Sequence, residues 1–336
     1  MQSSIAIIQN GRDKVFTLVA DSSVCIKRPE AEALGLKIVP HSFTVNGRMY
    51  FETYSDENGN YERMLKGHSL FTTSHPNRSA FLSCFEEELA QGNEVLCITI
   101  SSNLSESYSA ARMAAKQAGS GKVTVLDSRL AGGGLHLLIR EAHRLASSGL
   151  DRDAAAAQLM QRRELVRTAF AAGGKAPLQS RSFMSRVGDG IKDMMSVKPI
   201  LMLRGGIIVS GSSVKGRSGI IRALTRDAPA DVTELAVDYI GNSKLAAEIL
   251  HILRHRLPNA DILLHKIGPV LGIHLGFNAV AVSHAKFSSV KVEEESGNLL
   301  FLKEESEEST FLDDEDEFIE SVLSNGASSE PESSQA

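Results

Sequence analysis

Short apolar, β-branched runs alternate with longer helical patterns along most of this chain of 336 residues. Parallel strands need a crossover connection, which is usually a helix, so the alternation predicts an α/β fold in which mostly parallel sheets are flanked by helices. The predicted strands cover residues 15–20, 37–45, 95–100 and 123–126 in the first half and 207–210, 235–239, 261–265 and 279–283 in the second. One predicted helix begins after Asn103, and three others cover residues 78–89, 135–145 and 244–256.

The length of the chain predicts two domains, because one domain usually holds about 100–200 residues. A further helix is expected over residues 151–172, and the glycine-rich stretch after it, residues 173–177, indicates a domain junction. The expected order is an N-terminal extension at 1–14, an N-terminal α/β domain at 15–172, a C-terminal α/β domain at 173–288, and an acidic, largely disordered tail at 289–336.

Acidic residues concentrate at the C-terminal end. Residues 291–336 hold 15 Asp or Glu against two Lys, whereas the whole chain has a net charge of −5. The rest of the chain is therefore basic overall. A basic body can bind nucleic acid, but the chain has no Trp, only five Tyr and no block of Lys or Arg, so we expect no nucleic acid as a partner.

The sequence also predicts where the protein works. No apolar run approaches the ~20 residues that span a bilayer, so no stable membrane insertion is expected. The first residues lack the positive charges and the cleavage pattern of a signal peptide, which predicts a cytoplasmic protein. Cys25, Cys84 and Cys97 lie far apart and lack zinc or redox spacing, so we expect them to be reduced and mostly buried.

Polar residues follow three of the predicted strands. Asp21-Ser22 follows the first strand, residues 101–105 follow the strand at 95–100, and Asp127-Ser128 follows the strand at 123–126. In open α/β sheets, ligands bind outside the carboxyl ends of the strands, where a helix N-terminus offers free N–H groups to an anion. These residues are therefore candidates for holding a carboxylate or phosphate. Helix capping is the open alternative, because Ser, Asn and Asp are preferred caps.

Two further features carry polar side chains. Residues 72–76, Thr-Thr-Ser-His-Pro, precede a predicted helix, and capping is again the alternative. His274 is flanked by two glycines, which would allow a ligand or another backbone segment to come close. His251 and His255 share a helical face, but no third ligand lies nearby in the sequence, so we expect no metal there.

Common catalytic signatures are absent from the sequence. It contains no G-x-S-x-G, no P-loop, no H-E-x-x-H and no G-x-G-x-x-G after a strand. The glycine run at 132–134 lacks the spacing of a dinucleotide site, so close packing of a helix on a strand explains it better. Asp21 and Asp127 could bind Mg²⁺, although each is also a good turn or cap residue. We expect neither a cofactor nor a metal.

Several of these signals occur in one order along the chain and together resemble the DegV family of bacterial fatty-acid-binding proteins. The first half contributes V-A-D-S-S at 19–23, G-L-K-I-V-P at 35–40, V-N-G-R-M-Y at 45–50, T-S-H-P at 73–76, I-S-S-N-L-S-E-S-Y at 100–108 and V-L-D-S at 125–128. The second half contributes V-K-P-I at 197–200 and G-P-V-L-G-I-H-L-G at 268–276. The resemblance therefore spans about residues 15 to 285.

This resemblance implies a two-domain DegV-like fold with a long-chain fatty acid in a tunnel between the domains. The carboxylate would be held by hydroxyls and a histidine, which correspond here to Thr73, Ser105 and His274. The secondary candidates are Ser74, Ser102, Asp21, Ser22, Asp127 and Ser128. A carrier of this kind can present its fatty acid to a separate fatty-acid kinase, so it needs no catalytic groups.

The sequence departs from the family pattern at several places. Glu106-Ser107 replaces G-T, and a carboxylate beside Ser105 would repel an anionic headgroup unless it points away. Leu275 replaces a threonine and so removes a hydroxyl next to His274. The family segment K-V-R-G, linked to docking of the kinase, appears here with Lys215 in place of arginine and with Arg217 close by.

Two other functions stay open at this point. One is a phosphate-ester hydrolase or phosphoryl-transfer subunit that would use Asp21, Asp127 and His274. The other is a regulatory interaction protein that would act through its acidic tail. The acyl length, the existence of a cognate kinase and the oligomeric state do not follow from the sequence.

Overall fold

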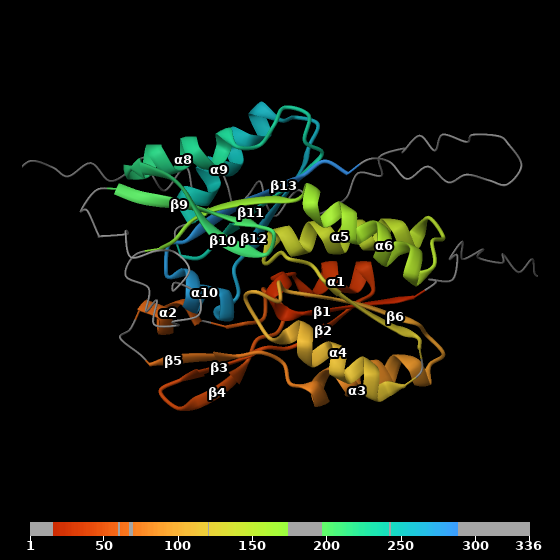
Figure 1. Ribbon diagram of the computed structural model, residues 1–336. Helices are drawn as coiled ribbons and strands as arrows, with labels where there is room; N and C mark the ends of the chain where they lie inside the picture. Colours follow the sequence, from red (N-terminus) through yellow and green to blue (C-terminus); the bar gives the residue numbers. More distant parts are fainter. Residues whose placement is uncertain are drawn as a thin grey trace, which may run out of the picture.

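The computed structural model describes residues 16–59, 61–66, 70–119, 121–173, 197–241 and 243–287. The expected N-terminal extension, most of the expected junction and the expected acidic tail lie outside these residues. The described chain forms two main sheets, with helix α5 (Gly133–Ser147) between them, and a small third sheet beside them (Figure 1). Among the helices of these residues, none has the length and apolar character needed to cross a membrane.

The first sheet is fully parallel, as the alternation of strands and helices predicts. Its strand order is β2-β1-β6-β7. The strands are β1 (Thr17–Asp21), β2 (Leu36–Val39), β6 (Val95–Thr99) and β7 (Val123–Asp127), and the helices around them are α1 (Arg28–Leu34), α3 (Arg78–Ala90), α4 (Ser107–Ala118), α5 and α6 (Arg152–Arg162). Two short 3₁₀ helices, η1 (Ser22–Val24) and η2 (Arg163–Leu165), complete this part.

Both faces of the first sheet are buried under helices. On one face, Phe81 and Phe85 of α3 and Ala111 of α4 pack in one cluster with Val19 and Cys97 of the strands. The other face packs against the apolar side of α5 in a second cluster. This layering confirms the α/β class. The expectation for the cysteines is also consistent with the structure, since Cys25 and Cys97 are buried and Cys84 is half-buried.

The second sheet is mostly antiparallel, so the expectation of two mostly parallel sheets is wrong for this half. Its order is β10-β9-β8-β13-β11-β12, and only β11 and β12 pair in parallel. The physical reason is a hairpin, because Gly205 and Gly206 both have positive φ and close a two-residue turn. The strands are β8 (Arg167–Ala171), β9 (Val197–Arg204), β10 (Ile207–Lys215), β11 (Glu234–Tyr239), β12 (Asp261–Lys266) and β13 (Val280–Ala285).

Helices α8 (Gly216–Arg226) and α9 (Ser243–Arg256) cover one face of the second sheet, and α5 packs against the other. The glycine run at 132–134 explains how α5 can pack so close to the strands of the second sheet. A Cβ on Gly133 would lie 2.6 Å from the Cβ of Ala236, and one on Gly134 would lie 2.8 Å from Thr168 Oγ1. The prediction that these glycines permit close packing of a helix on a strand is therefore confirmed.

Two other sequence predictions are wrong in detail. The helix expected over 151–172 ends at Arg162, and β8 follows it as a strand of the second sheet. The strand expected over 37–45 breaks at Pro40 into β2 and β3, which belong to different sheets. The division at residue 173 stays a prediction, and the sheet membership of β8 favours a boundary just before Arg167.

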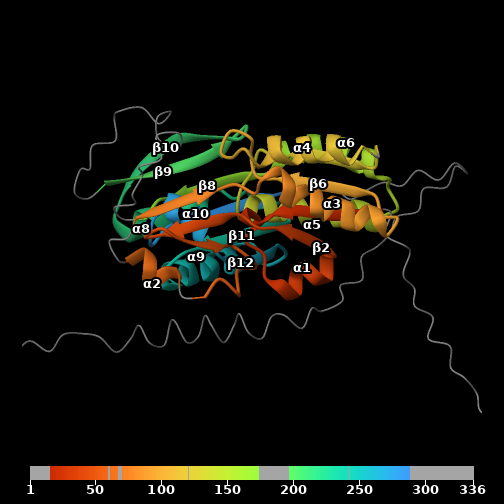
Figure 2. The same ribbon diagram turned by 90° about the horizontal axis from the view of Figure 1, so that it is seen from below.

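A small antiparallel sheet comes from the first half of the chain and holds a helix from the second half. Its order is β4-β3-β5, with β3 (Ser42–Val45), β4 (Arg48–Phe51) and β5 (Phe71–Ser74). Val270 and Ile273 of helix α10 (Pro269–Leu275) pack on Phe43 of this sheet. Helix α2 (Tyr61–Lys66) lies beside α10, and both views place these helices and the β9–β10 hairpin toward the same end of the molecule (Figures 1 and 2).

Candidate functional site

Thr73 and His274 meet where the small sheet packs against α10. Thr73 lies on β5 and His274 lies in the last turn of α10. Thr73 Oγ1 is 2.8 Å from His274 Nε2, and both residues are half-buried. The packing of α10 on the small sheet thus brings together two of the three residues that the sequence predicts for the headgroup.

The third residue, Ser105, begins a chain of hydrogen bonds that leads into the interior. Ser105 Oγ lies 2.9 Å from Ser107 Oγ, which lies 3.3 Å from His41 Nε2. On the other side of the ring, His41 Nδ1 is 3.2 Å from Ser22 Oγ, and Ser22 donates to Glu52 Oε2 at 2.7 Å. Since Ser22 gives its proton to Glu52, His41 donates from Nδ1 and accepts at Nε2. Ser107 then donates to His41, and Ser105 keeps a proton for Ser107 or for a ligand.

The electrostatics of this region favour neutral histidines. Burial lowers the pKa of His41 and of His274 below the ordinary value of 6.5. A positive charge on His41 would lower the pKa of His274 further, because two neighbouring cations repel each other. Burial raises the pKa of Glu52 to about 7, although hydrogen bonds from Ser22 and from the Val270 N–H oppose the shift. An anion here is therefore met by hydrogen-bond donors rather than by positive charges.

An apolar cavity adjoins both groups. Leu104 precedes Ser105 and Leu275 follows His274, and both leucines line the cavity. The space between its walls, including the mouth, is about 510 Å³. The other lining residues come from the loop before α5, from α10, from the segment before α10 and from five strands of the second sheet: Ala131, Gly132, Thr168, Phe170, Leu203, Ile208, Asp238, Ile267, Leu271 and Ala281. The cavity therefore lies between the two main sheets.

Comparison with known proteins decides the family. The profile described as "uncharacterised protein, DegV family" matches residues 15–286. The chain belongs to the DegV family. A DegV domain-containing protein of Clostridium perfringens is 24% identical over 278 residues, which cover 80% of this chain and 98% of that protein.

Two solved structures show the same fold. DegV of Bacillus subtilis, described as a fatty acid binding protein, is 25% identical and superimposes with a TM-score of 0.71 over 81% of this chain and 99% of that chain. The fatty acid kinase (Fak) B3 protein of Streptococcus pneumoniae, loaded with linoleic acid, is 16% identical with a TM-score of 0.69 over 80% of this chain and 99% of that chain.

The remaining DegV-motif residues of the first sheet make structural contacts. Asp21 is buried and accepts hydrogen bonds from the N–H groups of Ser23 and Ile100. Asp127 accepts from the Ser102 N–H at 3.0 Å and the Ser102 hydroxyl at 2.6 Å. Ser128 accepts from the Leu130 N–H at 2.9 Å. Capping and turn formation thus account for these secondary candidates, and Ser74 on β5 is exposed.

The two departures from the family pattern near the predicted headgroup residues have simple outcomes. Glu106 is exposed and forms the N-cap position of α4, so its carboxylate lies at the surface. Leu275 is half-buried and packs with Phe170, Leu203 and Ile208 against the second sheet. An apolar side chain that lines the cavity therefore takes the place of the threonine hydroxyl.

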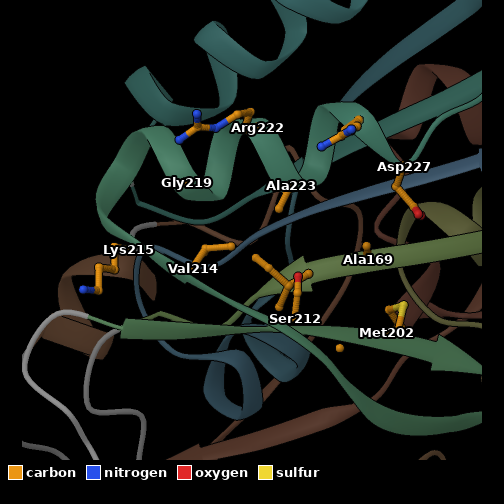
Figure 3. Close-up of a pocket in the computed structure, with 12 residues that line it drawn as sticks. Ala169, Met202, Ser212, Val214, Lys215, Gly219, Arg222, Ala223 and Asp227 are labelled. Carbon is orange, nitrogen blue, oxygen red and sulfur yellow. The ribbon is translucent and has the colours of Figure 1, made fainter.

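The predicted docking residues of this DegV chain lie on the opposite face of the second sheet, at the β10–α8 junction. Both Lys215 and Arg217 are exposed, and Arg217 forms an ion pair with Glu248 of α9 at 2.8 Å. Lys215 lies at one end of a groove between α8 and strands β9 and β10 (Figure 3). Arg222 of α8 also lines this groove.

His41, Glu52 and Ser107 were not among the residues predicted for the site. His41 directly follows the motif ending at Pro40, and Ser107 lies inside the motif at 100–108, so motif position could have pointed to both. Glu52 lies two residues after the motif ending at Tyr50, and only the tertiary structure places it against Ser22. A lone polar residue in a sequence gives no sign of such a partner.

Proposed function

We propose that this DegV protein is a carrier that binds one long-chain fatty acid and does not convert it. Thr73, Ser105 and His274 hold the carboxylate, and the acyl chain occupies the apolar cavity. The observation that carries this proposal is the Thr73–His274 hydrogen bond at 2.8 Å, with Leu275 next to His274 in the wall of the cavity.

The geometry supports a donor role for Thr73. If the proton of His274 is on Nε2, the ring donates to Thr73 Oγ1, and the threonine hydroxyl is left to donate to a carboxylate oxygen. Ser105 supplies a second hydroxyl proton from the end of its hydrogen-bond chain. Hydrogen bonds to a charged acceptor are worth about 1.5–3 kcal/mol each, so two donors can hold a carboxylate without a nearby cation.

The cavity supports an acyl chain as the remainder of the ligand. Nine of its lining residues are Leu, Ile, Phe or Ala. Each CH₂ group moved from water into such a site contributes about 0.8 kcal/mol. A long chain therefore supplies most of the binding free energy, and the headgroup residues fix its orientation.

The Fak B3 structure supports a finer proposal for the partner. A fatty-acid kinase would dock on the surface that carries Lys215 and Arg217 and would phosphorylate the carboxylate held by this chain. The carrier then needs no catalytic residues, and it acts in the cytoplasm, where the nucleotide substrate of a kinase is present. The hydrolase alternative receives no support from the geometry, because Asp21 and Asp127 accept hydrogen bonds from backbone N–H groups.

Denaturing mass spectrometry of the purified full-length protein tests the proposal. Solvent extraction should release a long-chain fatty acid at close to one molecule per chain, and delipidated protein should bind added palmitate or oleate. Absence of a released fatty acid together with no binding of either added acid would refute the carrier function.

A further inference from the structure

Three residues that are far apart in the sequence form a buried cluster away from the headgroup residues. They are Glu30 on α1, His136 on α5 and His265 on β12, and one ligand atom from each lies within 4.8 Å of the other two. The side chain of His136 is 0% exposed and that of His265 is 2% exposed. The two imidazole rings are stacked, with their centroids 4.3 Å apart.

We propose that Glu30, His136 and His265 form a binding site for a zinc-class divalent cation. The donor set, two imidazoles and one carboxylate, is one that Zn²⁺ takes in proteins, with a fourth position left for water. Harder cations such as Mg²⁺ and Ca²⁺ prefer oxygen ligands, so the two imidazoles argue against them.

Both ring nitrogens of His265 are buried and make no hydrogen bond to the described residues. Its Nδ1 is 3.4 Å from Asp238 Oδ1, and its Nε2 is 4.0 Å from Glu30 Oε2. A cation between Nε2 and Glu30 would give this nitrogen a partner. A carboxylate behind a metal-ligating histidine is the usual arrangement that fixes its tautomer.

Asp238 is itself fixed in place for this role. Its Oδ2 accepts a hydrogen bond from the Gly133 N–H at 2.9 Å, at the beginning of α5. The same helix carries His136, whose Nε2 is 2.8 Å from Glu30 Oε1. Helix α5 therefore orients one ligand directly and the other through Asp238.

His136 also lacks alternative partners in the described part of the chain. Its Nδ1 is buried and has no hydrogen-bond partner there. Binding of a cation at Nε2 requires that the proton now facing Glu30 move to Nδ1 or to solvent.

One positive group lies near the cluster. Arg140 is one turn after His136 on α5 and acts electrostatically on both Glu30 and His136. Its charge is balanced by an ion pair with Asp261 on β12. Glu30 is 26% exposed, which gives a cation a route from solvent to the buried histidines.

Occupancy would connect α1 and α5 with β12, that is, the helices of the first sheet with a strand of the second. A bound cation would thus stabilise the arrangement of the two halves that encloses the apolar cavity. Because it binds the folded chain only, it would also raise the unfolding temperature.

The test is a titration of the metal-free full-length protein with ZnCl₂ by calorimetry, with metal content measured after desalting. We expect one tight Zn²⁺ per chain and a raised unfolding temperature. Glu30→Gln, on a partly exposed side chain, should weaken binding at least about tenfold while the protein stays folded, and His136→Gln should do the same.

The matched control is His251→Gln/His255→Gln, which removes the surface pair of histidines on α9. This variant should bind Zn²⁺ as the wild type does. The proposal is overturned if the wild type binds no Zn²⁺ at stoichiometric concentration, if the α9 variant loses the binding, or if folded Glu30→Gln binds as tightly as the wild type. None of these results depends on whether the protein binds a fatty acid.

Discussion

His274 Nε2 lies 2.8 Å from Thr73 Oγ1, although 201 residues separate the two in the chain. The contact exists because a small sheet from the first half of the chain packs on α10 from the second half. It places a hydroxyl donor beside an apolar cavity that lies between the two main sheets.

Replacing Thr73 by valine should weaken fatty-acid binding. Valine keeps the β-branched shape but removes the hydroxyl, and one hydrogen bond to a charged group is worth about 1.5–3 kcal/mol, which corresponds to about tenfold or more in Kd. Binding of palmitate to delipidated protein, measured by calorimetry, checks this. Thr72→Val is the matched control, because Thr72 is exposed on the same strand. Equal losses in both variants would contradict the assignment.

Filling the cavity should shorten the ligand that the protein accepts. Ala281 lines the apolar cavity, so Ala281→Phe should reduce binding of palmitate by at least about tenfold and affect octanoate much less, since each excluded CH₂ costs about 0.8 kcal/mol. Ala223→Phe, in the groove under α8, is the control and should leave both affinities unchanged. If only the Ala223 variant loses palmitate, the acyl chain lies in the groove.

Glu52 should make stability fall with rising pH. Its pKa is about 7 in the folded protein, above the ordinary 4.5, so the folded state binds its proton more tightly than the unfolded state does. The stabilisation is present below about pH 4.5 and is lost as pH rises through 7, by roughly 3 kcal/mol in total.

Urea unfolding at pH 5 and pH 8 measures this effect as a difference between the wild type and Glu52→Gln. The wild type should lose stability relative to the variant between the two pH values. His41 acts in the opposite sense, because its lowered pKa removes stability as pH falls below 6.5, but it is common to both proteins and cancels. Glu106→Gln, on the surface, should show no such difference.

Reversing the charge of Lys215 should weaken docking of a fatty-acid kinase without changing fatty-acid affinity. Lys215 is exposed at the β10–α8 junction, on the face of the second sheet opposite the cavity. Lys215→Glu should reduce the rate at which a fatty-acid kinase phosphorylates the bound acid, and Lys244→Glu on α9 should not. An unchanged rate with Lys215→Glu would place the docking surface elsewhere.

The sequence predicts most of the first sheet because its signals are local. Buried parallel strands are almost entirely apolar, as in β6, and the glycines at the start of α5 indicate close packing. The second sheet is harder to predict, since β8 lies within the range 151–172 that the sequence predicts to be helical. Antiparallel pairing depends on partners that are distant in the chain.

The candidate site residues also differ in whether local sequence signals indicate them. Thr73, Ser105 and His274 could be proposed from the sequence because each lies inside an ordered motif. Glu52 could not, because its role depends on Ser22, which it contacts only in the folded protein. Glu30, His136 and His265 lie too far apart in the sequence to form a metal-binding motif. They come together only where α1, α5 and β12 meet.

A crystal structure of the protein loaded with palmitate tests the central claim most directly. The account predicts the carboxylate within about 2.6–3.2 Å of Thr73 Oγ1 and Ser105 Oγ, with the acyl chain between the two main sheets along Leu104, Phe170 and Leu275. A carboxylate bound instead beside Lys215 or Arg222, with the chain under α8, would contradict it.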